Sequence, residues 1–338
     1  MMLPTVLDIY DARRRLAAHL GPTPLRQSPW LSSIADGSVF LKLESLNLTH
    51  SFKIRGAFNA ALKLIENADK PSAFAQGAAA DKKGLSSSAL TVVTASAGNH
   101  GRALALVSEK LGLSCVVFTP ASAPETKKNA IRRHGAVLHG DCENYDVAEA
   151  KAREFAEAEG ATYISPYNHP DVIAGAGTVG LDLIEAMPSF DVLVVPLGGG
   201  GLASGVGLIV KAAAPRVTIV GVEVEASLPF TLSLEAGRIT GITPRASLAD
   251  GLTGNLEAES ITFELVKQVV DYVVTVSEDD LVRAMRGLAA EEHLIVEGAG
   301  VAATAAVIAG KASAPGQRVI ALVTGGNVDM PKWLFAVS

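Results

Sequence analysis

From residue 90 onward, the chain alternates short β-branched apolar runs with amphipathic or alanine-rich segments. Such short apolar runs predict buried strands, and the segments between them predict helices. The predicted strands are LTVVTAS at 90–96, SCVVFTP at 114–120, AVLHG at 136–140, TYIS at 162–165, DVLVVPL at 191–197, VTIVGVEVE at 217–225, YVVTVS at 272–277 and VIALVTGG at 319–326. Strands that alternate with helices are typical of βαβ units, so the pattern predicts an α/β protein with parallel sheets flanked by helices.

The intervening helices are predicted from their periodicity and end signals. One ends near Leu111, one follows Pro124, one spans 145–159, one spans 179–187 and one ends at Ala213. Ser277 followed by Asp280 forms a capping-box pattern that opens another helix. The stretch from Glu66 to Ser88 has no firm period and is rich in Ala, Ser, Gly and Lys, so we expect an exposed loop there.

Composition narrows the class of protein. A length of 338 residues suggests about two domains, and 49% hydrophobic with 19% charged residues indicates a globular chain. The net charge of −6 argues against a nucleic-acid partner, because binding a phosphate backbone needs an excess of Lys and Arg. Small molecules are therefore the expected ligands.

Cysteine usage and the apolar segments suggest a cytoplasmic protein. Two cysteines are too few for a disulfide framework, and Cys115 lies in an apolar run that predicts a buried thiol. The N-terminus has acidic residues and an Arg cluster where a signal peptide needs an apolar stretch. The longest uncharged run, Val192 to Val210, contains six glycines and predicts a strand, a loop and a helix rather than a membrane span.

Four glycines, Gly198 to Gly201, follow the strand DVLVVPL directly and precede a helical segment. Successive glycines let backbone N–H groups converge, and a helix N-terminus adds partial positive charge, so the loop suits a phosphate. The alternative is a flexible turn. A dinucleotide site is a weak match, because only the relaxed glycine motif that ends at Ala203 fits.

Lys53 lies between Phe52 and Ile54, at the predicted start of a helix that runs to about Leu64. A lysine held among apolar neighbours is poorly solvated in its charged form, which lowers its pKa and frees the amine for Schiff-base chemistry. The alternative is an ordinary solvated helix lysine.

Two further polar loops end predicted strands. In TASAGNHG, the Ser96 hydroxyl, the Asn99 amide and the backbone N–H groups of 97–101 suit a carboxylate, unless Ser96 or Asn99 is simply a helix cap. In LVTGGNVD, Thr324 leads into a glycine turn, which could equally be a plain strand end. Ligands of open α/β sheets collect at the carboxyl ends of strands, where both loops and the glycine run are predicted to lie.

These motifs together resemble the fold-type II pyridoxal-phosphate enzymes, specifically the threonine/serine dehydratase and serine racemase group. The resemblance extends over nearly the whole chain, through TPL at 23–25, LKLESLNLTHSFKIRGA at 41–57, SAGNHG at 96–101, VIAGAGT at 172–178, GGGGL at 198–202, LADG at 248–251, EGAG at 297–300 and TGGNVD at 324–329. It implies a tryptophan synthase β-like fold in two domains, with a large cofactor domain of residues 1–58 plus 166–338 and a small domain of 59–165. It also implies a homodimer.

The same resemblance implies roles for individual residues. Lys53 would bond to the aldehyde of pyridoxal 5'-phosphate and later remove the substrate α-proton, and Phe52 would pack on the pyridine ring. The remaining cofactor contacts would be Asn99 to the 3-hydroxyl, Gly198, Gly199, Gly200, Gly201 and Leu202 to the phosphate, and Thr324 to the ring nitrogen. The substrate carboxylate would lie against Ser96, Ala97, Asn99 and His100.

The implied reaction is β-elimination of an L-β-hydroxy amino acid, L-threonine or L-serine, to a 2-oxo acid and ammonia. A neutral hydroxyl at Thr324 does not enforce a protonated ring nitrogen, which favours elimination over transamination. Racemases of the group carry a second serine where this chain has Ala97, so a racemase is the less favoured alternative. A nicotinamide oxidoreductase, with Glu223 on a ribose, would leave Lys53 and Thr324 without a role.

The chain also departs from the family pattern. His50 stands where glycine is usual, which bears on substrate scope. Tyr167 stands where Phe is frequent, and LADG continues as LTGNLEAES at 252–260; these two changes could widen the pocket for an aromatic substrate such as phenylserine. Some members bind a divalent cation through a Glu and two ligands four and six residues later; here Glu223 is followed by Ser227 and Pro229, so we expect no metal. The chain ends at Ser338, so we expect no regulatory domain and no feedback control.

Overall fold

The computed structural model describes residues 2–69, 90–96 and 98–338. The chain separates into two compact units, one of Met1–Phe52 with Tyr167–Ser338 and the other of Lys53–Pro166. The domain limits expected from the sequence stay a prediction.

The first unit is built on one sheet, in the order β1-β2-β10-β7-β8-β9. Its strands are β1 (Leu25–Gln27), β2 (Ser38–Leu43), β7 (Val192–Pro196), β8 (Thr218–Val224), β9 (Tyr272–Val276) and β10 (Arg318–Val323). All neighbouring pairs are parallel except β1 with β2, which are antiparallel. The parallel strands from β7 onward confirm the prediction, whereas β1 and β2 precede the segment in which strands were expected.

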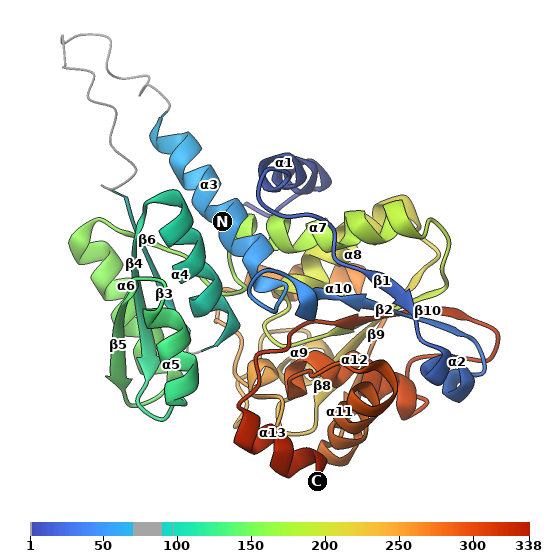
Figure 1. Ribbon diagram of the computed structural model, residues 1–338. Helices are drawn as coiled ribbons and strands as arrows, with labels where there is room; N and C mark the ends of the chain where they lie inside the picture. The colour runs from blue at the N-terminus through green and yellow to red at the C-terminus, as the bar shows by residue number, and fades with distance from the viewer. Residues whose placement is uncertain (1, 70–89, 97) are drawn as a thin grey trace. The chain divides into compact units, whose positions relative to one another are not determined.

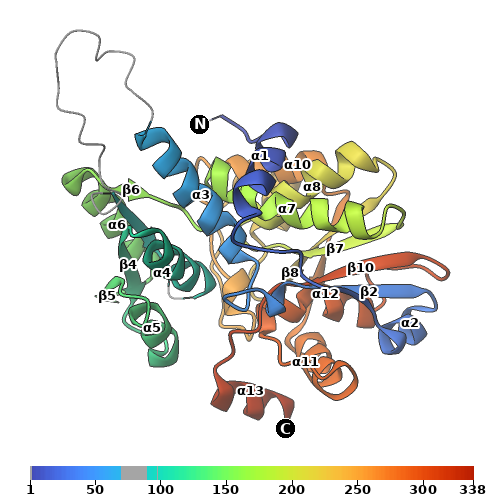
Figure 2. The same cartoon turned by 45° about the horizontal axis from the view of Figure 1, so that its top comes forward.

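Helices cover both faces of this sheet, as Figure 1 and Figure 2 show. One face carries α7 (Pro170–Ala186), α8 (Gly201–Ala213), α9 (Pro229–Ala236) and α10 (Ile261–Val269), and the other carries α2 (Pro29–Ala35), α11 (Glu278–Glu292), α12 (Gly298–Ile308) and α13 (Met330–Val337). Short 3₁₀ turns follow β2 (Glu44–Leu46) and precede α10 (Asp250–Leu252). Side chains alternate between two cores, because successive strand residues point to opposite faces: Leu193 packs in one core and Val194 in the other.

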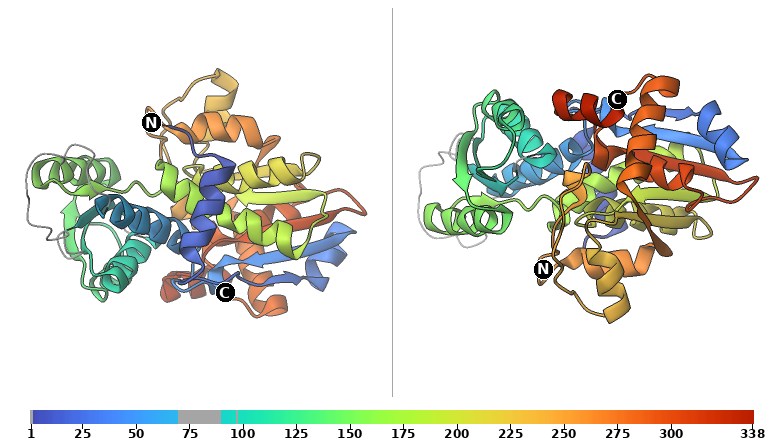
Figure 3. Two further views of the ribbon diagram at one scale, coloured as in Figure 1. Left: turned by 90° about the horizontal axis from the view of Figure 1, so that it is seen from above. Right: turned by 90° about the horizontal axis from the view of Figure 1, so that it is seen from below.

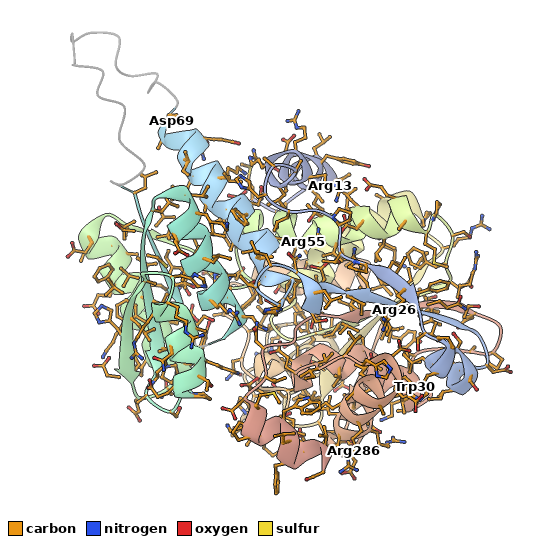
Figure 4. The ribbon with its side chains drawn as sticks, viewed as in Figure 1. Arg13, Arg26, Trp30, Arg55, Asp69 and Arg286 are labelled. Atoms are coloured by element: carbon orange, nitrogen blue, oxygen red, sulfur yellow. The ribbon has the colours of Figure 1, made fainter. Side chains whose placement is uncertain are left out.

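Helix α1 (Val6–Leu16) lies across α7, as the view from above in Figure 3 shows. Arg13, labelled in Figure 4, forms an ion pair with Asp182 of α7. It forms a second ion pair with Glu185, in which Nη2 of Arg13 lies 2.6 Å from Oε2 of Glu185. Asp182 also lies 2.9 Å from the buried amine of Lys42 on β2. A buried charge needs such partners, so this cluster fixes α1 and α7 on the sheet.

The second unit holds a parallel sheet in the order β5-β4-β3-β6. Its elements are α3 (Lys53–Ala68), β3 (Thr91–Ala95), α4 (Asn99–Leu111), β4 (Ser114–Pro120), α5 (Glu125–Arg132), β5 (Val137–Cys142), α6 (Tyr145–Glu159) and β6 (Thr162–Tyr163). Helix α6 packs on one face through Val93, Val116 and Phe118. Gly101 of α4 lies against Val117, which points to the opposite face.

Two helices differ from their predicted limits. Helix α7 starts at Pro170, nine residues before the expected Val179, because His169 accepts the Asp171 N–H at 3.2 Å and caps the helix. Its residues Val172 to Leu183 are all buried, so the start of the helix has no alternation of polar and apolar faces. The sequence therefore lacks the amphipathic pattern from which the first turns could be predicted. Helix α3 ends at Ala68 rather than near Leu64, and residues 70–88 of the expected loop lie outside the described residues.

Other predicted features are confirmed. Helix α6 has the expected limits, and Ser277 and Asp280 form the reciprocal capping box of α11. The uncharged run from Val192 to Val210 folds as strand β7, the glycine loop and most of α8. Among the helices in the described ranges, none is long and apolar enough to cross a membrane.

Candidate functional site

Lys53 is the first residue of α3 and is half-buried. Its amine donates a hydrogen bond to the Pro166 carbonyl at 2.8 Å. The nearby Ile164 carbonyl lies 3.3 Å from His100 Nε2. Segment 164–166 therefore contacts both the lysine and the start of α4 within the second unit.

The residues just before Lys53 are bound to the turn that follows β10. Phe52 N–H donates to the Thr324 carbonyl at 3.1 Å, and Gly326 N–H donates to the His50 carbonyl at 2.9 Å. Ser51 and Gly325 form an antiparallel bridge between these two bonds. Residues 50–52 are thus fixed at the carboxyl end of β10, where Thr324 is buried.

The glycine run connects β7 to α8, which are both labelled in Figure 2. Strands β10 and β7 are hydrogen-bonded neighbours, with Ala321 opposite Val194, so Thr324 and Gly198 follow adjacent strand ends. Gly200 is the N-cap of α8, has a left-handed backbone with φ 82°, and is not capped by a side chain. The N-terminal N–H groups of α8 and the partial positive charge of the helix are therefore available to an anion.

Three side chains enclose this loop. A Cβ atom on Gly199 would lie 2.3 Å from Tyr167 Cγ, and one on Gly200 would lie 2.5 Å from Phe230 Cζ. Thr262 donates its hydroxyl to the Gly199 carbonyl at 2.8 Å. Because these contacts leave no room for a side chain, the glycines are required by packing as well as by backbone conformation.

Sequence reasoning missed Phe230 and Thr262 as neighbours of the glycine loop. Both lie far from it in the chain, and neither belongs to a motif. Tyr167 was singled out for the pocket, but its ring packs on Gly199 and its hydroxyl accepts the Glu257 N–H at 2.9 Å.

The loop after β3 leads directly into α4. Ser96 is buried, and its hydroxyl accepts the Gly98 N–H at 3.2 Å. The N-cap of α4 is Gly98, which makes no side-chain capping bond, and Asn99 is the first helical residue. The alternative in which Ser96 or Asn99 caps the helix is therefore wrong. His100 is buried in the first turn, and Ala97 lies outside the described residues.

Leu202 is buried in the core beneath the glycine loop and supplies the second residue of α8. His50 is exposed and adopts a left-handed backbone with φ 56°. Glycine adopts that conformation without a steric cost, which explains in physical terms why glycine suits this position.

Glu223, near the end of β8, is fully buried. Burial raises its pKa above the usual range, although hydrogen bonds from Thr231 and Phe230 oppose the rise. Its oxygens accept three bonds, from Phe230 N–H at 2.7 Å, Thr231 N–H at 2.9 Å and the Thr231 hydroxyl at 2.6 Å. The carboxylate that a dinucleotide site would place on a ribose is thus bound within the protein.

Comparison with known proteins identifies the family of the chain. Residues 16–325 match the family described as pyridoxal-phosphate dependent enzyme. The chain is 36% identical to the L-threonine dehydratase catabolic TdcB of Escherichia coli K12, over 98% of this chain and 95% of that protein. Among solved structures it is similar to a pyridoxal 5'-phosphate-dependent aspartate racemase (TM-score 0.86, 31% identity, 99% of both chains). It is also similar to a threonine deaminase from T.th. (TM-score 0.83, 35% identity, 96% of this chain and 99% of that one). This chain belongs to the family of pyridoxal-phosphate dependent enzymes.

Proposed function

We propose that the protein is an ammonia-lyase that converts an L-β-hydroxy amino acid, L-threonine or L-serine, to a 2-oxo acid and ammonia. The observation that carries the proposal is the Phe52–Thr324 hydrogen bond of 3.1 Å. It fixes the residue before Lys53 at the end of β10, and the neighbouring strand β7 ends in the glycine loop. Relatives named threonine dehydratase match 98% of the chain and support the substrate class.

The residues fit pyridoxal 5'-phosphate. The uncapped N-terminus of α8, with its enclosed glycines, suits the phosphate, and the Thr324 hydroxyl suits the ring nitrogen. We assign the Phe52 ring to the pyridine face, the Asn99 amide to the 3-hydroxyl and the Lys53 amine to the aldehyde. When bound, the cofactor supplies an electron sink for negative charge at the substrate α-carbon.

The loop after β3 is the proposed site for the substrate carboxylate. Ser96 supplies a hydroxyl, and the N-terminus of α4 supplies the N–H groups of Asn99 and His100 without a competing side-chain cap. The helix N-terminus favours an anion there. By sequence, the N–H of Ala97 belongs to the same loop.

Lys53 is the proposed base that removes the α-proton. Its amine stands at the start of α3, where the Pro166 carbonyl accepts one of its N–H groups at 2.8 Å. That bond fixes the direction of the amine, and a well-oriented base gains much of its catalytic effect from position. Thr324 is uncharged, which favours loss of the β-hydroxyl over transamination.

The first experiment measures 2-oxo acid and ammonia released from L-threonine, L-serine and L-threo-phenylserine by the purified protein. We expect release from at least one substrate, loss of that release in Lys53→Ala, and retention in the matched control Lys63→Ala on the same helix. The rank order of rates identifies the substrate, and phenylserine leading would indicate a phenylserine dehydratase. No release from any of the three would overturn the proposal.

Amino-acid racemisation is the second candidate, because the aspartate racemase structure is similar over 99% of both chains. Racemisation needs an acid on the far face of the substrate, and Ala97 has no hydroxyl to supply one. The two functions separate by chiral analysis of serine and aspartate recovered from the reaction. Appearance of the D-enantiomer faster than 2-oxo acid would favour the racemase.

We further propose that each chain has a large domain of 1–58 plus 166–338 and a small domain of 59–165. We also propose that the protein is cytoplasmic and that two chains form a homodimer. Exposed apolar side chains at the N-terminus, Leu7 at 74% and Tyr10 at 53%, support a partner surface on α1. Sedimentation equilibrium tests the dimer directly, and a mass of one chain at all concentrations would exclude it.

A further inference from the structure

We propose that Glu223 is a positioning residue for the glycine loop, because it caps α9 and thereby holds Phe230 against Gly200. The proposal rests on the phosphate-binding role of Gly198 to Gly201 proposed above. The proposal also gives the Glu223 carboxylate a role that does not involve a cation.

Helix α9 is capped from outside its own segment. Its N-cap residue Leu228 makes no side-chain hydrogen bond, and its first residue is Pro229. Glu223 reaches the helix from β8, accepting the Phe230 N–H at 2.7 Å with Oε1 and the Thr231 N–H at 2.9 Å with Oε2. The Thr231 hydroxyl adds a third bond, of 2.6 Å, to Oε2. A buried carboxylate at a helix N-terminus satisfies N–H groups that otherwise lack acceptors.

This cap determines where Phe230 lies. Phe230 is fully buried, and its backbone N–H is one of the groups bound by Glu223. The far end of its ring, Cζ, lies 2.5 Å from the place where a Cβ on Gly200 would be. Gly200 is the N-cap of α8, so the ring contacts the residue that opens the proposed phosphate-binding helix.

Glu223 matches the first position of the divalent-cation pattern that the family resemblance implies for some members, but the two later positions do not fit it. Of the two later positions, Ser227 exchanges hydrogen bonds with Gly254, and Pro229 has no side-chain oxygen. Within the described ranges, no group of three or more His, Cys, Asp or Glu side chains is placed to hold a metal ion. The donors of α9 engage both oxygens of the carboxylate.

The test compares two ligands of the apoenzyme, pyridoxal phosphate and pyridoxal, which lacks the phosphate. A misplaced glycine loop weakens binding of the first ligand alone, whereas a general structural defect weakens both. Glu223→Gln keeps the size of the side chain but replaces one acceptor oxygen by an NH₂ group. Glu225→Gln is the matched control, because Glu225 is exposed and only two residues away.

For Glu223→Gln we expect the dissociation constant of pyridoxal phosphate to rise about tenfold, as for loss of one charge-assisted bond, with that of pyridoxal unchanged. Phe230→Leu shortens the side chain at Gly200 and should give the same selective loss, whereas Glu225→Gln should match the wild type. Equal ratios of the two constants in all four proteins would overturn the proposal. A wild type that binds both ligands equally would overturn the phosphate site itself.

A second measurement addresses the cation. The unfolding temperature of the wild-type holoenzyme should be the same in excess EDTA and in millimolar MgCl₂. A rise with Mg²⁺ that Glu223→Gln abolishes would place a cation on this carboxylate and overturn the proposal.

Discussion

The ring of Tyr167 lies face-on against Gly199 in the glycine loop. A Cβ on Gly199 would lie 2.3 Å from Cγ and 2.6 Å from both Cδ atoms of that ring. The ring is fixed at its other end, where its hydroxyl accepts the Glu257 N–H at 2.9 Å. Two segments distant in sequence therefore set the position of the loop backbone.

Gly199→Ala should damage the loop because neither the ring nor the backbone can move away cheaply. We expect a loss of about 1–3 kcal/mol in the free energy of unfolding, the usual cost of an overpacked site. The affinity for pyridoxal phosphate should fall at the same time. Urea unfolding and cofactor titration measure the two effects.

Gly241→Ala is the matched control, because a Cβ at Gly241 meets no atom within 4 Å. It should leave both stability and cofactor affinity close to those of the wild type. Equal behaviour of the two variants would show that the Tyr167 contact does not constrain Gly199.

Local pattern in the sequence predicts the elements that carry the candidate residues. The glycine loop, Lys53 at a helix start and Thr324 at a strand end each follow from an apolar run next to a turn or helix signal. The enclosing contacts of Phe230 and Thr262 do not, because they depend on how α9 and α10 pack beside α8. A single sequence carries no signal for such long-range packing.

His50→Gly should be tolerated or slightly stabilising. A non-glycine residue in the left-handed region costs about 1–2 kcal/mol. Glycine removes that cost but adds about 0.4–1 kcal/mol of unfolded-state entropy. The net gain in unfolding free energy should therefore be about 0–1.6 kcal/mol. Lyase activity should be retained, because His50 is exposed.

Two comparisons make this prediction specific. His293, with φ 56° at the end of α11 and an exposed side chain, should respond to glycine in the same way. His50→Val should be destabilising, since a β-branched residue is poorly accommodated at positive φ. Urea unfolding of His50→Gly, His293→Gly and His50→Val measures these changes in stability. A His50→Val protein as stable as the wild type would contradict the prediction.

Asp280 should stabilise the fold near neutral pH and lose that effect in acid. Burial acts to raise its pKa, but the Ser277 N–H, the Arg283 guanidinium and the Ser277 hydroxyl outweigh it and hold the pKa below the ordinary 3.8. A lowered folded-state pKa means stability that is present above the unfolded value and lost as pH falls through the folded one. Asp280→Asn should therefore cost about 1 kcal/mol near neutral pH.

The difference between wild type and Asp280→Asn should shrink as the pH falls below 3.8. Asp279→Asn is the control, because Asp279 is an exposed residue of the same first turn and its replacement should cost only about 0.3 kcal/mol. Urea unfolding at a series of pH values gives the profile. A pH-independent difference would show that geometry rather than charge explains the effect.

Cys115 should be unreactive in the folded protein. Burial raises its pKa to about 12, against a small lowering by Ser108, so almost none of the thiol is ionised near neutral pH. Cys142 is also buried and not disulfide-bonded. An aromatic disulfide reagent should thus modify neither thiol in the native enzyme and both in denaturant. Because reaction then requires opening of the fold, its rate in the native protein should reach a limit at high reagent concentration. One thiol that reacts rapidly under native conditions would show that β4 or β5 opens to solvent far more easily than its packing indicates.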